Sequence, residues 1–211
     1  MKLRRKGMYM GDIAKRLKAS KSSVSYWVRD VKLTKSQRNK LNSKGHSVNA
    51  IEKRRISRLA NTKARHEAVI AEAMCEAEEL SGNKLWCVGV LLYWCVGGKT
   101  QNIVRISNND PVVIQTMMNF FKNVCGVDSS KFRGHIHIFS HSDVEKAEKY
   151  WPKVSGVKRS QFYKTYQKQS STGKKKIDSL PNGTFQLYVH EKDLFLKMMG
   201  WIEYLKKNHH A

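Results

Sequence analysis

The sequence predicts an α+β protein whose first half is helical and whose second half combines strands with helices. All three prolines lie at position 111 or later, so none interrupts the first half, where apolar residues recur at helical spacing. Near residue 100 the pattern changes to short alternating runs, which are typical of half-buried strands. A formal charge of +23 and an isoelectric point near 10.0 indicate a polyanionic partner, of which nucleic acid is the commonest.

Length and hydropathy limit the class of protein. A chain of 211 residues with 40% hydrophobic residues can form one ordinary domain and a smaller one. No apolar run reaches the roughly 18 residues of a membrane-spanning helix, and the segment MKLRRKGMYM lacks the apolar core of a signal peptide. We therefore expect no membrane partner and a cytoplasmic protein, associated with the nucleoid of a prokaryote or a phage-infected cell.

Charge divides the chain into three zones. Residues 1–66 hold 20 Lys and Arg against 3 Asp and Glu, residues 67–98 hold 1 against 5, and residues 99–211 hold 19 against 9. With the change in periodicity, these zones predict a helical DNA-binding domain over 1–45, a linker helix over 46–82 and an α+β domain over 83–211. The low-complexity segment SSTGKKK is expected to be a basic loop.

The first domain contains two short apolar stripes separated by a break at Ala19 and Ser20. Their apolar positions are Ile13, Ala14 and Leu17, followed by Val24, Trp27, Val28 and Val31. The small side chain of Ala14 permits two helices to approach closely, and Ser20 can cap the second helix. This pattern, I-A-x-x-L-x-x-S-x-x-x-V-x-x-W, resembles a helix-turn-helix.

The helix-turn-helix resemblance implies that residues 21–29 form a recognition helix in the major groove of DNA. The side chains expected to contact DNA from it are Lys21, Ser22, Ser23, Ser25, Tyr26 and Arg29. The alternative is a plain helical hairpin with a solvated basic face. The surrounding positive charge favours DNA reading.

The linker segment AIEKRRISRLANTKARHEAVIAEAMCEAEEL is basic in its first half and acidic in its second. This order opposes the helix dipole, which favours acids at the N-terminus, so it must serve something other than helix stability. The side chains expected to follow DNA phosphates are Arg54, Arg55 and Arg58, together with Lys53, Lys63 and Arg65. For any one of them, a solvated face is the alternative.

The third zone alternates between strand and helix patterns. Strands are expected at QNIVRIS, FRGHIHIF, QFYKTYQK and TFQLYVH, and helices at DPVVIQTMMNFFKNVCG, SDVEKAEKYWPKVSG and EKDLFLKMMGWIEYLKK. Asp110 and Pro111 fit the N-cap and the first position of a helix. The four cysteines, Cys75, Cys87, Cys95 and Cys125, form no C-x-x-C pair, and we expect buried free thiols rather than disulfides or a zinc site.

The order of elements from residue 83 to 207, led by GVLLYWCVGGKT, resembles one LAGLIDADG domain of the homing-endonuclease type. The segments SNNDPVVI, YWPKVSGVKRSQFYK and GTFQLYVHEKDLFLKMMGWIEYLKK match proteins that join a helix-turn-helix to a single such domain. In the family the motif helix packs against its twin, so the resemblance implies a homodimer with Gly89, Tyr93 and Gly97 in the interface. The alternative is that this helix is the core of a monomer.

The resemblance also implies DNA contacts from the sheet and a metal at the end of the motif helix. The expected contacts are Arg105, Arg133, Lys158, Arg159, Lys164 and Lys168. In the family, an acid just before the terminal glycine binds a divalent metal; here Gly97 matches the glycine, and Val96 stands where the acid would be. Hydrolysis of a phosphodiester needs carboxylates to hold Mg²⁺, and Asp110, the nearest acid, fits a helix cap better.

His135 and His137 lie on one face of an expected strand, and His141 follows nearby. A metal site or a nuclease histidine is conceivable, but no carboxylate or asparagine pattern accompanies them. We therefore expect these histidines to face phosphates or solvent.

These patterns together predict a protein that binds double-stranded DNA sequence-specifically, a transcriptional regulator on a catalytically inactive homing-endonuclease scaffold. No cofactor and no catalytic residue are expected. The pairing resembles the WhiA-type regulators, in which the two domains occur in the opposite order. The alternative is an active homing-type or mobile-element endonuclease that uses Mg²⁺. A recombinase is disfavoured because no Ser or Tyr nucleophile within an arginine cluster can be identified.

Overall fold

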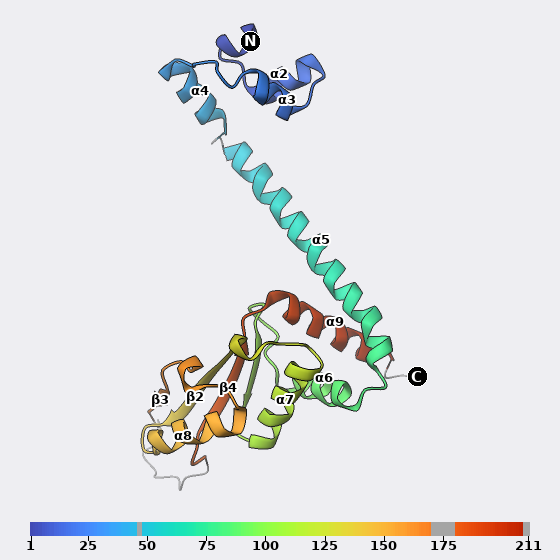
Figure 1. Cartoon of the computed structure of the whole chain (residues 1–211), viewed down its shortest axis with the longest axis vertical. Coiled ribbons are helices and arrows are strands. Elements are labelled where there is room, and N and C mark those ends of the chain that lie inside the picture. The colour runs from blue at the N-terminus through green and yellow to red at the C-terminus, as the bar shows by residue number, and fades with distance from the viewer. Residues whose placement is uncertain (46–47, 170–179, 209–211) are drawn as a thin grey trace. The chain divides into compact units, whose positions relative to one another are not determined.

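The structure, a computed structural model, describes residues 1–45, 48–169 and 180–208. It has the predicted α+β class, with an N-terminal helical region, one long helix and a mixed four-stranded sheet (Figure 1). Within these residues no helix is both long enough and apolar enough to cross a membrane. The basic loop expected at SSTGKKK lies outside the described residues.

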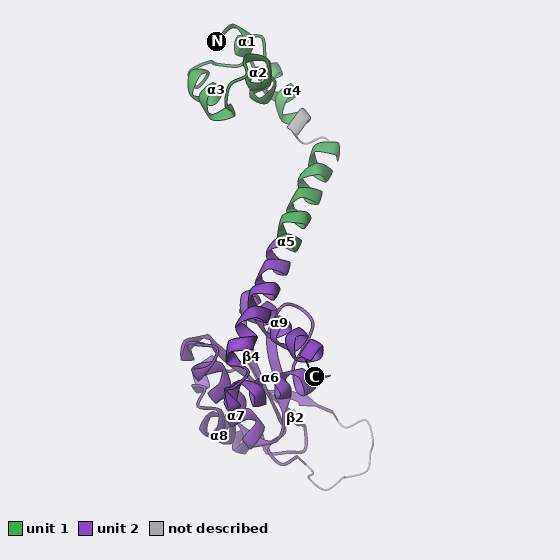
Figure 2. Cartoon of the chain, turned by 90° about the vertical axis from the view of Figure 1, so that its right-hand side faces the viewer, with its two compact units in different colours: residues 1–64 green, residues 65–211 purple. Residues whose placement is uncertain are grey.

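Two compact units, Met1–Ala64 and Arg65–Ala211, make up the chain (Figure 2). The division falls inside the long helix. The first unit contains α1 (Lys2–Arg5), α2 (Met10–Leu17), α3 (Lys21–Trp27) and α4 (Lys35–Gly45).

The small core of the first unit forms where α2 meets α3. Ile13 and Ala14 of α2 are buried together with Val24 and Val28, as the two stripes predict. The expected burial of Leu17 and Trp27 was wrong, since these side chains are 52% and 49% exposed. Each is the last residue of its helix, and after Trp27 it is the next residue, Val28, whose side chain enters the core.

The long helix α5 (Val48–Leu80) is the predicted linker helix, and its second half belongs to the core of the second unit. Ala73 is buried there, and a Cβ on Gly200 of α9 (Lys192–Asn208) would lie 2.7 Å from the Ala73 Cβ. Beside this close approach, Glu76 Oε1 accepts a hydrogen bond from Lys197 Nζ at 2.7 Å. The acidic second half of α5 therefore supplies Glu76 as the ion-pair partner of Lys197 in α9.

The remaining elements follow the predicted order of helices and strands. They are α6 (Lys84–Val96), β1 (Val104–Asn108), α7 (Pro111–Asn123), β2 (Phe132–Phe139), α8 (Val144–Ser155), β3 (Tyr166–Lys168) and β4 (Thr184–Val189), with short 3-10 turns at Ser129–Lys131 and Arg159–Gln161. The strand expected over QFYKTYQK forms only in its last three residues. The described strands lie in the order β1-β4-β2-β3; β4 pairs antiparallel with β1 and β2, and β2 pairs parallel with β3.

One face of the sheet carries the core of the second unit. Ile106, Ile136, Phe185 and Leu187 alternate with polar residues along their strands and are buried. They join a single apolar cluster with residues from the end of α5 and from α6, α7, α8 and α9 (Figure 1). The Trp151 ring of α8, for example, stacks on Phe185 with 5.1 Å between ring centroids. Within residues 1–45, 48–169 and 180–208, no helix covers the opposite face of the sheet.

The glycine face of α6 packs inside the same chain. Gly89 and Tyr93 are buried, and a Cβ on Gly89 would lie 2.2 Å from the Phe120 ring of α7. A Cβ on Gly97 would lie 2.5 Å from the carbonyl oxygen of Tyr93. The close approach of Gly89 is therefore to α7 of the same chain, which corrects the expected dimer contacts of the buried Gly89 and Tyr93, whereas the expected contact of the half-buried Gly97 stays a prediction.

The four cysteines are free, but the expectation that all are buried was wrong. Cys75 and Cys95 are exposed. The sequence did not predict this, because an apolar segment does not reveal which face of its helix meets the core. Burial raises the pKa of the Cys125 thiol to about 12, so this thiol stays protonated and unreactive at neutral pH.

Replacing Gly89 by Ala should destabilise the protein by about 1–3 kcal/mol, because the new methyl group would overlap the Phe120 ring. Helix propensity alone predicts the opposite sign, a gain of about 1 kcal/mol. Denaturant unfolding gives the change in free energy. Gly82→Ala, in the turn before α6, is the control for a methyl group added without a clash, since a Cβ there meets nothing within 4 Å. Stabilisation by Gly89→Ala would contradict the packing described above.

Candidate nucleic-acid interface

The outer face of α3 is polar and exposed, as expected for a helix that meets DNA. Lys21, Ser22, Ser25 and Tyr26 are exposed, and Tyr26 keeps 70% of its surface. The helix ends at Trp27, so residues 28 and 29 are not part of it, which corrects the expected range of 21–29. Arg29 instead lies in the following turn, with its guanidinium 5.3 Å from the centre of the Tyr26 ring.

A serine network fixes the N-terminus of α3. The Ser20 hydroxyl accepts a hydrogen bond from the backbone N–H of Ser23 at 3.0 Å, so the predicted cap is confirmed. The same oxygen lies 2.8 Å from the hydroxyls of both Ser22 and Ser23. Ser23 is half-buried and tied to the cap. The network therefore positions the helix end and leaves Lys21, Ser25 and Tyr26 as the better candidates to touch bases.

The arginines of α5 differ in how they are engaged. Arg55 forms a two-point contact with Glu52, at 2.8 and 2.7 Å, and this contact lowers the pKa of the Glu52 carboxyl. Arg54 Nε donates to the carbonyl oxygen of Ala50 at 3.0 Å, and Arg65 pairs with Asp193 at 2.7 Å. Arg58 is exposed, so we regard it as the best phosphate contact of the predicted three.

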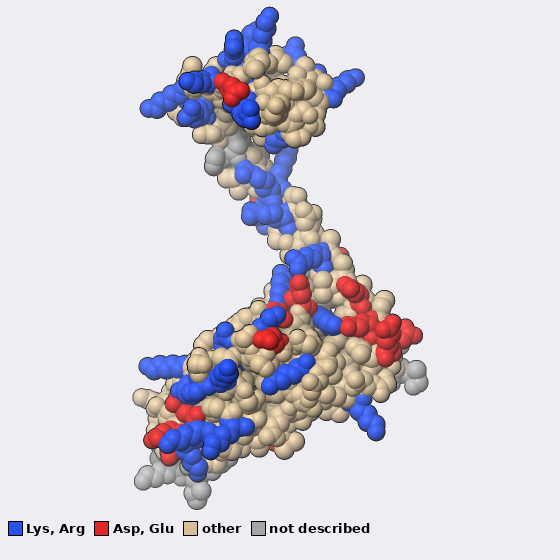
Figure 3. Space-filling model, viewed as in Figure 1, with Lys and Arg blue, Asp and Glu red and all other residues tan. Residues whose placement is uncertain are grey.

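Surface charge follows the zones in the sequence. Figure 3 shows Lys and Arg gathered over the first unit and along the first half of α5, whereas Asp and Glu gather near the C-terminal end of α5. A polyanion would be attracted to the first of these regions and repelled from the second.

The open face of the sheet is a second polar surface. Strand alternation and register place on it Arg105, Ser107, Arg133, His135, His137, Phe139, Tyr166, Lys168, Thr184, Gln186 and Tyr188. None of these residues is acidic. A surface of cations, amides and rings without carboxylates is suited to contact nucleic acid.

The basic residues predicted to contact DNA from this domain differ in how far they are available for such a contact. Arg105 and Lys168 lie on the open face, but Arg133 Nη1 donates to the carbonyl oxygens of Ser130 at 2.6 Å and Phe132 at 2.8 Å, so its guanidinium is held at a turn.

Lys158, Arg159 and Lys164 lie outside the strands, on the exposed segment between α8 and β3. Arg159 pairs with Glu148 at 2.6 Å, which reduces its value as a phosphate ligand.

A row of rings crosses the open face, and sequence reasoning missed most of it. Centroid distances are 5.9 Å from Tyr163 to His135, 4.3 Å from His135 to His137, and 5.2 Å from His137 to Tyr166. The Tyr163 hydroxyl also lies 2.8 Å from His190 Nε2. Alternation in FRGHIHIF revealed the two histidines. The tyrosines could not be placed beside them without the register of β3 and the path of the chain before it.

The two histidines of β2 interact directly. His137 Nε2 lies 3.0 Å from His135 Nδ1. Burial, followed by the charges of His135 and Arg105, lowers the pKa of His137 below its ordinary value of 6.5. His137 is therefore neutral at pH 7 in the free protein.

The end of α6, where the family resemblance places a metal ligand, carries the apolar Val96. Asp110 is the N-cap of α7 and accepts a hydrogen bond from Val112 N–H at 2.8 Å, which confirms its predicted role as a cap. In the described part of the chain, no three His, Cys, Asp or Glu side chains are grouped to hold a metal ion. No family model, curated protein sequence or solved structure matches this chain significantly.

Lowering the pH from 7.5 to 5.5 should destabilise the wild type more than the His137→Gln variant. An unfolded histidine takes up a proton near pH 6.5, whereas the folded structure lowers the pKa of His137, so the unfolded state binds more protons below that pH. The contribution of His137 to stability is thus present above pH 6.5 and is lost as the pH falls.

Melting temperatures at the two pH values measure this effect, with His66→Gln in α5 as the control for losing one histidine. An equal fall in all three proteins would show that His137 is not perturbed.

Proposed function

We propose that this chain binds double-stranded DNA sequence-specifically and acts as a transcriptional regulator. The observation that carries the proposal is α3, a serine-capped helix on a packed two-helix unit, with an exposed polar face. It lies in a region of the chain that holds 20 Lys and Arg against 3 Asp and Glu. A helix held at its N-terminus and surrounded by positive charge can enter a major groove at low entropic cost.

The two polar surfaces have different roles in this proposal. Lys21, Ser25 and Tyr26 of α3 contact base edges, whereas Arg58 of α5 contacts phosphates and carries no sequence information. The open sheet face adds a second contact region, through Arg105 and the ring row.

The second unit is proposed to be a LAGLIDADG-like scaffold without cleavage activity. Val96 cannot bind a metal, and Asp110 is engaged as a helix cap; both observations support binding over hydrolysis. A nuclease of this type needs carboxylates that bring Mg²⁺ to the scissile phosphate.

We further propose that the outer face of α6 binds a second copy of the chain. No charged residue occurs between Leu85 and Val96, and a helix that is apolar on all sides is normally buried on all sides. The inner face meets α7, yet on the outer face Val88 and Leu91 are 46% and 48% exposed, and Cys95, one turn after Leu91, is exposed on the same face. A stripe at this spacing is self-complementary about a twofold axis. We therefore still propose a homodimer, but its interface is the face of α6 opposite to the buried Gly89.

Purified protein should bind duplex DNA with an affinity that falls by about 10³ or more between 50 and 200 mM salt, because many phosphate contacts release counterions. Tyr26→Ala should reduce the preference among sequences selected from a random library. Arg58→Ala should weaken binding to all sequences alike and lower the salt slope by about 0.9.

Fluorescence anisotropy measures these affinities. A salt-insensitive affinity would contradict DNA binding, and identical behaviour of the two variants would contradict the assignment of α3. Nicking of supercoiled plasmid with Mg²⁺ or Mn²⁺ would favour the endonuclease alternative.

Sedimentation of the wild type should show a dimer. Leu91→Glu should raise the dimer dissociation constant by at least about 30-fold, the effect of losing ~2 kcal/mol at the centre of an interface. Leu59→Glu in α5 is the matched control, because Leu59 is also about half exposed, at 56%, and it should leave the dimer intact. A monomeric wild type would refute the proposed interface.

A further inference from the structure

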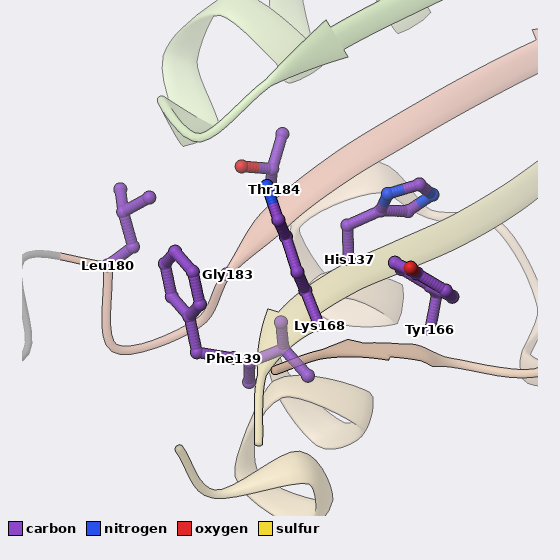
Figure 4. A pocket seen from close by; sticks show the side chains of 8 residues that line it. His137, Phe139, Tyr166, Lys168, Leu180, Gly183 and Thr184 are labelled. Carbon is purple, nitrogen blue, oxygen red and sulfur yellow. The ribbon is translucent and has the colours of Figure 1, made fainter. Parts of the chain in front are cut away.

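A small pocket lies at the end of the ring row on the open sheet face. Its volume is about 140 Å³, and its lining comes from the end of β2, from β3, from Leu180 and Gly183 before β4, and from Thr184, the first residue of β4. Figure 4 shows Phe139 and Leu180 on one side of the Lys168 side chain, and His137 and Tyr166 on the other. The pocket therefore has two aromatic walls and a flexible cation between them.

The volume of the pocket limits the size of the group that it can enclose. A cavity of about 150 Å³ in an engineered protein core holds one benzene molecule, so a pocket of about 140 Å³ accommodates a single six-membered ring. A fused two-ring group exceeds this volume and would leave one ring outside the pocket. Tyr166 is 52% exposed, so a ring can reach this wall from solvent.

We propose that this pocket takes one unpaired pyrimidine base of DNA bound on the sheet face. The inference rests on the proposed function and names a subsite within it. A pyrimidine has one ring, a polar edge and an attached phosphate, and the lining offers a partner for each. The ring stacks on Tyr166, the Thr184 hydroxyl meets the polar edge, and the Lys168 ammonium moves aside to pair with the phosphate.

Two features of the surroundings favour a nucleobase over an apolar side chain of a protein partner. The strand residues of the open face contain cations, His, Gln and Tyr but no carboxylate, so the surface attracts phosphates. The rings of Tyr163, His135, His137 and Tyr166 already contact one another in a row. A base in the pocket extends that row beyond Tyr166, so stacking continues from protein to DNA.

The form of DNA that should bind most tightly follows from the energy needed to unpair a base. A base inside a duplex must be unstacked and unpaired before it can enter, whereas a bulged base has lost its pairing already. The protein should therefore distinguish a duplex with one bulged pyrimidine from the same duplex without it.

The test uses the full-length chain and three duplexes of one sequence, fully paired, with one bulged thymine, or with one bulged adenine. Fluorescence anisotropy should show the thymine bulge bound about tenfold more tightly than the paired duplex, as expected for one base stacked on an aromatic side chain. The adenine bulge should gain at most about twofold. Tyr166→Ala should abolish the thymine preference, and Tyr166→Phe should keep it.

Lys164→Ala is the control for lost charge, because Lys164 is exposed nearby but does not line the pocket. It should weaken all three duplexes alike, whereas Lys168→Ala should weaken the thymine bulge most. Equal affinities for the paired and bulged duplexes would overturn the pocket and leave DNA binding intact. A thymine preference that survives Tyr166→Ala would also overturn it, since the bulge would then act through DNA bending. Failure to bind any duplex would overturn both proposals.

Discussion

The packing of α6 against α7 at Gly89 is the contact on which the second unit depends. There is no space for a side chain at this glycine, because the Phe120 ring occupies it. At the end of the helix the buried Tyr93 hydroxyl donates to the carbonyl oxygen of Gly98 at 2.7 Å, which ties the turn after α6 to the helix. With α6 held this close, Gly89 has a packing role inside one chain.

A one-sided core follows from this arrangement. All of α6, α7, α8 and α9 contribute to the same apolar cluster, so the strands bury alternate residues and present the others to solvent. Two different surfaces remain outside that core. The outer face of α6 is apolar and partly exposed, whereas the open sheet face carries cations and aromatic rings.

The two halves of α5 also differ in charge and in what they contact. The acidic second half supplies Glu76 to Lys197 of α9, within the second unit. The basic first half is mostly exposed and carries few acids, and Arg58 is exposed within it. The charges of α5 are arranged unfavourably for the helix dipole. This arrangement separates the acidic second half, which packs on its own chain, from the basic first half, which is exposed and suited to a polyanion.

Local patterns in the sequence were sufficient for the element order, the Ser20 and Asp110 caps and the alternation of β2, because periodicity and capping depend on neighbouring residues. They did not reveal which face of α6 is covered, since the helix is apolar on both sides and its glycines suit any close partner. The exposure of Leu17 and Trp27, the ion pair of Arg159 and the row from Tyr163 to Tyr166 were equally hidden. Each depends on residues distant in sequence meeting in space, which only the tertiary structure decides.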